Sequence, residues 1–239
     1  MVEPVEFSVV IPSFNEAASL PLLQQRLKKV MEETKERYEI LYVDDGSSDD
    51  TLAVLQALKK DSPCLRSISL KKKRGQSVAL YAGFSAARGK WIITLDADGQ
   101  NPPEEIPKLL SFRDRFDCVC GVRRARKDSA LRKFDSHIAR VVRSWVLGDT
   151  TQDVGCSLRT FRREIVDALP RVRNFHRFFT FLVRQMGFSV KEVSVAHDKR
   201  LFGNSKYGTW ARLREGWRDL WGMRWLKSRI ITYEVTHED

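Results

Sequence analysis

Short β-branched runs alternate with amphipathic stretches over the first 120 residues, and this alternation constrains the fold more than any other feature. The runs predict strands at 7–11, 38–43, 65–70 and 91–95. Helical patterns lie between them at about 16–37, 49–60 and 75–88. Strands separated by helices of this length form right-handed βαβ units. The sequence therefore predicts an α/β domain whose mostly parallel sheet carries helices on both faces.

Polar loops follow three of these strands, at the sheet edge where open α/β folds bind their ligands. The loops are Pro-Ser-Phe-Asn-Glu at 12–16, Asp-Asp-Gly-Ser-Ser-Asp-Asp-Thr at 44–51 and Asp-Ala-Asp-Gly-Gln-Asn-Pro-Pro at 96–103. Any one of them could be an ordinary helix cap or helix start. Three such loops converging on one edge of a sheet favour a ligand site instead.

The third loop has the spacing of a cation site. Asp96 and Asp98 stand two residues apart at a strand end, so both carboxylates can be directed at one cation, and Gln100 offers a third oxygen. Mg²⁺ and Mn²⁺ prefer oxygen ligands and share them with the phosphates of a bound ligand. The loop therefore predicts a divalent-cation site for a phosphorylated ligand.

Other catalytic motifs are absent from the sequence. Residues 83–91 superficially resemble a P-loop, but five residues separate the two glycines, Trp follows the Lys, and the segment precedes a strand. No GxGxxG, HExxH or GxSxG motif occurs. These negatives exclude ATPase, dehydrogenase, zinc-protease and esterase functions.

Composition bounds the class of protein. The 239 residues, 42% of them apolar, are enough to bury a core, which excludes a disordered chain. The sequence predicts neither a membrane-spanning helix nor a secretory leader. Its four cysteines, which form no CxxC pair, are expected to be buried thiols of a reducing cytosol and not zinc ligands: Cys64, Cys118, Cys120 and Cys156.

The charge balance points to an anionic partner. The chain carries 42 Lys and Arg against 31 Asp and Glu, a formal net charge of +11. Such an excess fits nucleic acid, a phosphorylated ligand or an acidic membrane surface, and it also fits a merely soluble basic surface. Net charge alone does not choose among these four.

The loop residues resemble glycosyltransferase family 2. Residues 10–16, 43–48 and 95–100 are similar to the nucleotide-sugar half of that family, which has the Rossmann-like GT-A fold. Residues 152–159 and 200–207 resemble later motifs of its polyprenyl-phosphate group, the dolichol-phosphate-mannose synthase-like enzymes.

The resemblance covers about residues 6–228 and implies a domain layout. A GT-A catalytic domain is expected at 1–206, with its nucleotide-sugar half at about 6–122 and its acceptor half at 123–206. A C-terminal amphipathic helix with a short tail is expected at 207–239.

The resemblance also implies roles for individual residues. The implied donor-binding residues are Pro12, Phe14, Glu16, Asp45, Gln76, Asp96, Ala97, Asp98, Arg200 and Lys206. The implied ligands of Mg²⁺ or Mn²⁺ are Asp96, Asp98 and Gln100. The acceptor phosphate is assigned to Arg123, Arg132 and Ser136, and the catalytic set to Asp98, Asp96, Arg123 and Arg132. One departure from the family pattern is Gly99, where many polyprenyl enzymes carry leucine, and glycine is expected to loosen the loop.

Two basic amphipathic segments lie outside the nucleotide-sugar half. Within 121–149, apolar residues recur at helical spacing from Leu131 to Trp145, opposite a basic face that is either solvated or phosphate-binding. Four of the six tryptophans lie within 207–229, opposite a row of Arg and Lys. This second pattern suits the headgroup zone of an anionic bilayer, although its apolar stripe could instead pack on the catalytic domain. No recognised nucleic-acid motif is present, so a membrane surface is favoured.

The implied activity is transfer of one sugar, with inversion, from a nucleotide sugar to a polyprenyl or dolichyl phosphate at the cytoplasmic face of a membrane. Mannose from GDP-mannose is the expectation weighted by the family, and a UDP-sugar of the glucose type is the alternative donor. A separate membrane-spanning subunit is left open, and no nucleic-acid partner is expected. The alternatives outside transferases are a nucleotidyltransferase, which would release pyrophosphate, and a basic nucleic-acid-binding protein, which would need no divalent cation.

Overall fold

The computed structural model describes residues 4–123, 130–198 and 209–231, and it describes no side chains for 130–137 and 209–214. Seven strands of the described residues form one sheet in the order β3-β2-β1-β4-β6-β5-β7. The strands are β1 (Phe7–Ser13), β2 (Tyr38–Asp44), β3 (Leu65–Ser69), β4 (Trp91–Thr94), β5 (Cys118–Arg123), β6 (Arg159–Arg162) and β7 (Val190–Val195). Only β6 runs antiparallel to its neighbours, β4 and β5, so the mostly parallel sheet is confirmed.

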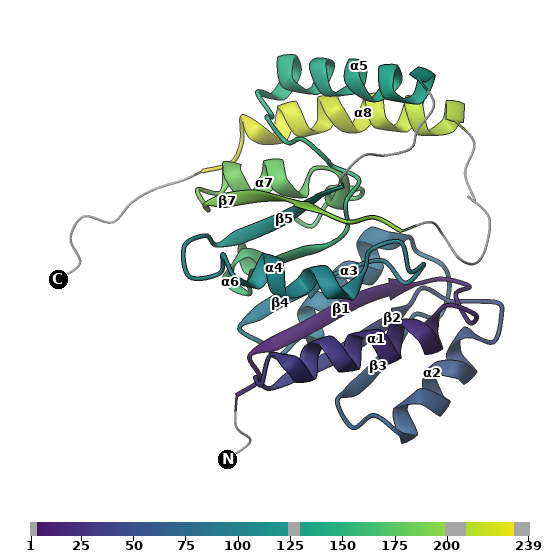
Figure 1. Cartoon of the computed structure of the whole chain (residues 1–239). Helices are drawn as coiled ribbons and strands as arrows, with labels where there is room; N and C mark the ends of the chain where they lie inside the picture. Colours follow the sequence, from purple (N-terminus) through teal and green to yellow (C-terminus); the bar gives the residue numbers. More distant parts are fainter. Residues whose placement is uncertain (1–3, 124–129, 199–208, 232–239) are drawn as a thin grey trace.

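Helices cover both faces of the sheet (Figure 1). Those of the first half are α1 (Leu20–Glu33), α2 (Thr51–Lys60), α3 (Gln76–Ala86), the 3-10 turn η1 (Pro103–Glu105) and α4 (Ile106–Leu110). Those that follow are α5 (Ala130–Leu147), α6 (Glu164–Ala168), the 3-10 turn η2 (Phe175–Arg177), α7 (Phe179–Gln185) and α8 (Thr209–Lys227). The βαβ alternation predicted for the first 120 residues is therefore confirmed.

The first helix is shorter than the pattern at 16–37 predicts. Asn15 has a left-handed backbone with φ of 54°, and the Ser19 hydroxyl donates to the Glu16 carbonyl, so the chain turns before α1 begins. Lys35 is again left-handed, with φ of 58°, and a residue in that conformation cannot continue a right-handed helix.

The core lies on both sides of the sheet, because alternate residues of one strand pack into different clusters. Val9 and Ile11 of β1 face the cluster beneath α1, α2 and α4. Val10 faces the cluster beneath α3, α5, α7 and α8. Three cysteines are buried as expected, but the prediction is wrong for Cys64, which is only partly buried because it precedes the edge strand β3.

The helices α5 and α8 lie side by side at one end of the molecule (Figure 1). The second core cluster includes Leu220 and Met223 of α8, so part of this helix packs on the rest of the α/β domain. Arg224 and Lys227 donate to the carbonyl groups of Val146 and Leu147, each at 2.8 Å. The C-terminal helix expected within 207–229 is thus present and tied to α5. None of the helices in the described ranges is both long and apolar enough to cross a membrane.

Candidate active site

The loop after β4 presents the Asp-x-Asp pair on a tight turn. Asp98 is buried and accepts a hydrogen bond from the Gln100 backbone N–H at 3.1 Å. Gly99 has φ of 74°, a left-handed conformation in which a side chain would be strained, so glycine suits this turn. The turn folds the Asp98 side chain inward, away from bulk solvent.

Asp96 is held on two sides. Gln76, the first residue of α3, donates from Nε2 to the Asp96 carboxylate at 2.9 Å. The backbone N–H of Asp96 donates to the Ser157 hydroxyl at 3.1 Å, and the Asn101 amide donates to the same hydroxyl at 2.8 Å. Residues far apart in the chain therefore fix the loop that carries the two acids.

Burial and, after it, the negative charge of Asp98 raise the pKa of Asp96 to about 6, against the opposing effects of Ser157, Arg159 and Arg123. A carboxylate whose charge is disfavoured by burial and by a neighbouring acid is a setting that a cation would stabilise. Among the described residues, no group of three or more His, Cys, Asp or Glu is arranged to hold a metal. The oxygen donors Asp96, Asp98 and Gln100 fit a hard divalent cation that takes its remaining ligands from a diphosphate.

The loops after β1 and β2 are joined to each other, as their predicted convergence requires. The backbone N–H of Asn15 donates to the Ser47 hydroxyl at 2.9 Å, and that of Glu16 donates to the Thr51 hydroxyl at 2.9 Å. The ammonium group of Lys73 lies 3.9 Å from the centre of the Phe14 ring.

Asp45 is buried and engaged by backbone. Its two carboxylate oxygens accept the N–H groups of Arg74 and Gly75 at 2.7 Å and 2.8 Å. This carboxylate therefore positions the segment that leads into α3, a role that the sequence pattern did not indicate. Its predicted contact with the donor stays a prediction.

Arg123, at the end of β5, is already paired. Its guanidinium group donates two hydrogen bonds to Asp153, each 2.7 Å long. Burial would raise the pKa of Asp153, but the hydrogen bonds and positive charge of Arg123 outweigh it and hold that pKa below its ordinary value. A Cβ atom on Gly155 would lie 2.5 Å from the same guanidinium group, so the absence of a side chain at 155 leaves room for the pair.

We expect Gly155→Ala to displace Arg123 from Asp153 while leaving the fold intact, because the clash falls on the end of a flexible side chain. If Arg123 binds the acceptor phosphate, the KM for the acceptor should rise about tenfold with the affinity for the nucleoside diphosphate unchanged. The matched control is Gly222→Ala, because a Cβ atom added at this exposed position would contact no other residue. A Cβ atom at Gly187 would also contact nothing, but the backbone there has φ of 86°, so alanine would be strained. An unchanged acceptor KM would contradict the assignment of Arg123.

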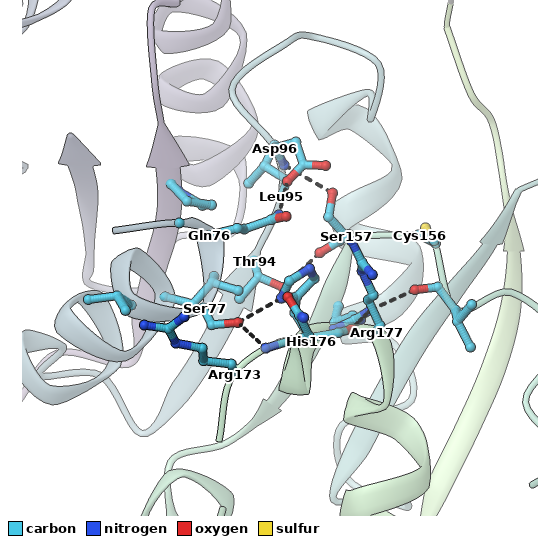
Figure 2. A pocket seen from close by; sticks show the side chains of 18 of the residues that line it. Gln76, Ser77, Thr94, Leu95, Asp96, Cys156, Ser157, Arg173, His176 and Arg177 are labelled. Atoms are coloured by element: carbon cyan, nitrogen blue, oxygen red, sulfur yellow. Dashed lines mark hydrogen bonds between the residues drawn. The ribbon is translucent and has the colours of Figure 1, made fainter. Parts of the chain in front are cut away.

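A cavity of about 540 Å³ opens at the carboxyl end of β4 (Figure 2). One wall is the first turn of α3 with Asp96, and the other is formed by residues 154–159 and 173–177. Four arginines line it, Arg74, Arg159, Arg173 and Arg177, together with polar Ser77, Ser157 and His176. A cavity that joins a carboxylate loop to a wall of guanidinium groups suits a ligand carrying both a cation-bound diphosphate and further negative charge.

Several of these lining residues were missed by the sequence analysis. Ser157 and Arg159 belong to the motif at 152–159, which was recognised as similar to the family but whose residues were given no function. No sequence pattern indicated Ser77 or His176, because 99 positions separate the two residues and only the fold brings them together. Of the predicted residues, Pro12, Gln76 and Asp96 line the cavity. Arg132 and Ser136 lie on α5 with side chains outside the description, and Arg200 and Lys206 lie outside the described residues.

Comparison with known proteins decides the family. The sequence model described as glycosyl transferase family 2 matches residues 8–169, which is more than half of the chain. The chain belongs to glycosyltransferase family 2. The resemblance identified from the loop motifs is thereby confirmed.

Curated relatives carry the name undecaprenyl-phosphate 4-deoxy-4-formamido-L-arabinose transferase. That of Pseudomonas syringae pv. syringae is 42% identical over 208 residues, which cover 85% of this chain and 61% of the relative. That of Photorhabdus laumondii is 42% identical over 202 residues, with 84% and 62% covered. This family 2 chain therefore spans about three fifths of the length of these relatives.

Solved structures confirm the GT-A fold. Mannosyl-3-phosphoglycerate synthase from Rubrobacter xylanophilus has a TM-score of 0.74 at 15% identity, covering 98% of this chain and 79% of its own. A mannosyltransferase from Pyrobaculum calidifontis, in complex with GDP-mannose and Mn²⁺, has a TM-score of 0.64 at 22% identity, with 98% and 67% covered. At these identities the likeness extends to the fold of the family 2 domain and no further.

Proposed function

We propose that the chain transfers one sugar from a nucleoside diphosphate sugar to a polyprenyl phosphate. The observation that carries the proposal is the cavity at the end of β4, which joins the Asp96 loop to arginines on the opposite wall. The names of the relatives support a polyprenyl phosphate of the undecaprenyl class as acceptor. They also support an arabinose-derived sugar more than the mannose that the sequence analysis expects.

The chemistry needs no dedicated general base. A phosphate monoester has a second pKa near 6, so the lipid phosphate already carries an anionic oxygen at neutral pH. That oxygen attacks the anomeric carbon from the face opposite the nucleoside diphosphate, which gives inversion. The remaining requirements are alignment of the two substrates and stabilisation of the departing diphosphate.

Residues of this chain divide those tasks. Asp96, Asp98 and Gln100 would hold the divalent cation, which supplies Lewis-acid stabilisation of the leaving group when bound. Asp45 and Phe14 would bind the nucleoside side of the donor, and Arg200 and Lys206 would add positive charge near the diphosphate. Arg123, Arg132 and Ser136 would place the acceptor phosphate, since guanidinium groups bind phosphate oxygens in pairs.

The exposed side of α5 and α8 supports a membrane-facing position for the acceptor site. Trp145 of α5 is 82% exposed, and Trp217, Trp221 and Trp225 of α8 are 55%, 45% and 63% exposed. Large apolar side chains this exposed, next to the basic residues Arg218, Arg224 and Arg229, suit an anionic membrane surface. A cytoplasmic-face location at that membrane is part of this proposal.

Thermal-shift titration of the whole chain tests the donor site. UDP, GDP, UDP-arabinose, UDP-glucose and GDP-mannose are added with and without Mn²⁺. A ligand at one hundred times its Kd stabilises the folded state by about 2.7 kcal/mol, which is a shift of about 5 °C or more for a chain of this size. We expect a metal-dependent shift with nucleotides of one base. No shift with any nucleotide in the presence of metal would overturn the donor site.

A further inference from the structure

A hydrogen-bonded relay forms the cavity wall that faces Asp96 (Figure 2). The backbone N–H of Asn174 donates to the Ser77 hydroxyl oxygen at 2.9 Å. The same hydroxyl lies 3.0 Å from Nδ1 of His176. Ser77 is buried on the first turn of α3, one residue after the Gln76 that binds Asp96.

The direction of this relay determines which histidine nitrogen carries the proton. Since Ser77 accepts from a backbone N–H, its own hydrogen needs an acceptor, and within the described part of the chain Nδ1 of His176 is the one within reach. A buried hydroxyl without an acceptor is costly. Nδ1 is therefore unprotonated, and a neutral imidazole in that state carries its hydrogen on Nε2.

The surroundings keep this imidazole neutral. Burial and, after it, the positive charges of Arg159 and Arg177 lower the pKa of His176 to about 3. At neutral pH the ring thus offers one N–H donor and no charge. Nε2 of His176 forms no hydrogen bond with any described residue, and His176 lines the cavity. The Nε2–H group can therefore donate to a ligand there.

The backbone beneath the ring is held from three directions. Arg159 donates to the His176 carbonyl at 3.0 Å. The Asn174 side chain donates to Glu215 at 3.0 Å and to Asp219 at 2.9 Å, both on α8. The Phe175 ring packs 4.5 Å from Tyr81 of α3. A donor held this firmly imposes a direction on its acceptor.

We propose that Nε2–H of His176 donates a hydrogen bond to an oxygen atom of the donor's sugar, which makes His176 a specificity residue and Ser77 its positioning residue. The inference rests on the proposed function, because the sugar follows the diphosphate into the cavity beyond Asp96. A neutral donor suits a hydroxyl or an acyl-amide carbonyl, whereas phosphate oxygens suit the neighbouring guanidinium groups. The nucleoside side of the donor is assigned elsewhere, near Asp45 and Phe14.

Titration calorimetry in Mg²⁺ measures the contribution of the sugar. The wild type and its variants are titrated with UDP and GDP, and with UDP-arabinose, UDP-glucose and GDP-mannose. His176→Phe keeps a ring but removes the donor, and we expect about a tenfold loss of affinity for the sugar nucleotide that binds best. Its affinity for the matching nucleoside diphosphate should stay within about twofold of the wild type.

Conservative variants separate the hydrogen bond from packing. In His176→Gln the amide Nε2 reaches the place of the imidazole Nε2, so the affinity gained from the sugar should return to nearly the wild-type value. Ser77→Ala should lose part of the affinity contributed by the sugar, because the His176 imidazole is no longer oriented by the Ser77 hydroxyl. The exposed Ser85, two turns further along α3, gives the matched control Ser85→Ala, which should change nothing.

Nitrogen NMR reads the tautomer directly. With ¹⁵N-histidine labelling, the signals of His176 are those that disappear in His176→Phe. We expect Nε2 protonated and Nδ1 unprotonated in the wild type, a mixture of tautomers in Ser77→Ala, and a shift of Nε2 on adding the sugar nucleotide but not the nucleoside diphosphate.

The results can show whether the role of His176 or the proposed sugar-transfer function has failed. A protein that binds no nucleoside diphosphate contradicts the proposed function, and the inference falls with it. If the protein binds a nucleoside diphosphate, the remaining measurements test the role of His176 by itself. A protonated Nδ1, an unchanged sugar contribution in His176→Phe, or no added affinity from any of the three sugars would then overturn it.

Discussion

Replacing Asp98 with asparagine is expected to lower sugar transfer about a thousandfold while the protein remains folded. The carboxylate is 7% exposed and accepts the Gln100 N–H that closes the turn, and an asparagine oxygen can accept the same bond. The substitution removes one negative charge from a pair that would hold the divalent cation. Stabilisation of a leaving diphosphate by such a cation amounts to several kcal/mol, and each 1.4 kcal/mol is about a factor of ten in rate.

The choice of asparagine follows from the burial of Asp98. Alanine would leave the Gln100 N–H without its partner, so a loss of activity would mix catalysis with a disturbed turn. Asp114→Asn provides the matched control, since this carboxylate is 91% exposed and lies outside the cavity. Steady-state rates and thermal unfolding of both variants are measured together. An Asp98→Asn protein with normal turnover would show that the Asp-x-Asp loop holds no catalytic cation.

The second large effect is expected at the membrane. A variant with Trp217, Trp221 and Trp225 all changed to alanine should bind anionic vesicles about a hundredfold more weakly. If each indole buries about 36 Å² of apolar surface in a headgroup layer, at about 25 cal/mol per Å², the three together contribute about 2.7 kcal/mol, which is about a factor of one hundred. Sedimentation with vesicles of phosphatidylethanolamine and phosphatidylglycerol measures the loss, and high salt should weaken binding of the wild type by screening.

Point changes test this surface better than removal of the helix. Leu220 and Met223 of α8 are buried against the rest of the α/β domain, so truncating the chain before α8 would expose the core. The control is Leu22→Ala with Leu52→Ala, which removes exposed apolar side chains from α1 and α2. Equal sedimentation of the triple tryptophan variant and this control would rule out α8 as a membrane contact.

Local patterns predicted the first half of the fold well. The strands β1 and β4 contain short β-branched runs, and β2 is rich in large apolar residues. The loops after these three strands carry polar residues that stand out against them. Parallel topology then brings the loops after β1, β2 and β4 to one edge without any further information. Loop 12–16 meets loop 44–51 for this reason alone.

The second half depended on pairing that no local pattern contains. The strand β6 has four residues, Arg-Thr-Phe-Arg, and is recognisable only because it pairs with β4 and β5. The Arg123–Asp153 pair joins residues 30 positions apart, and the Ser77–His176 contact spans 99. The C-terminal helix was predicted correctly, but the sequence could not show that one side of it packs inward while three tryptophans stay exposed.

Sugar transfer to a lipid phosphate is the most direct test of the central claim. The whole chain is incubated with Mg²⁺, undecaprenyl phosphate and each candidate sugar nucleotide, and both the released nucleotide and the lipid product are quantified. We expect nucleoside diphosphate to be released in equal amount to the glycolipid formed, and only when the lipid phosphate is present. Release of pyrophosphate, or release of nucleoside diphosphate at a rate that the lipid phosphate leaves unchanged, would contradict it.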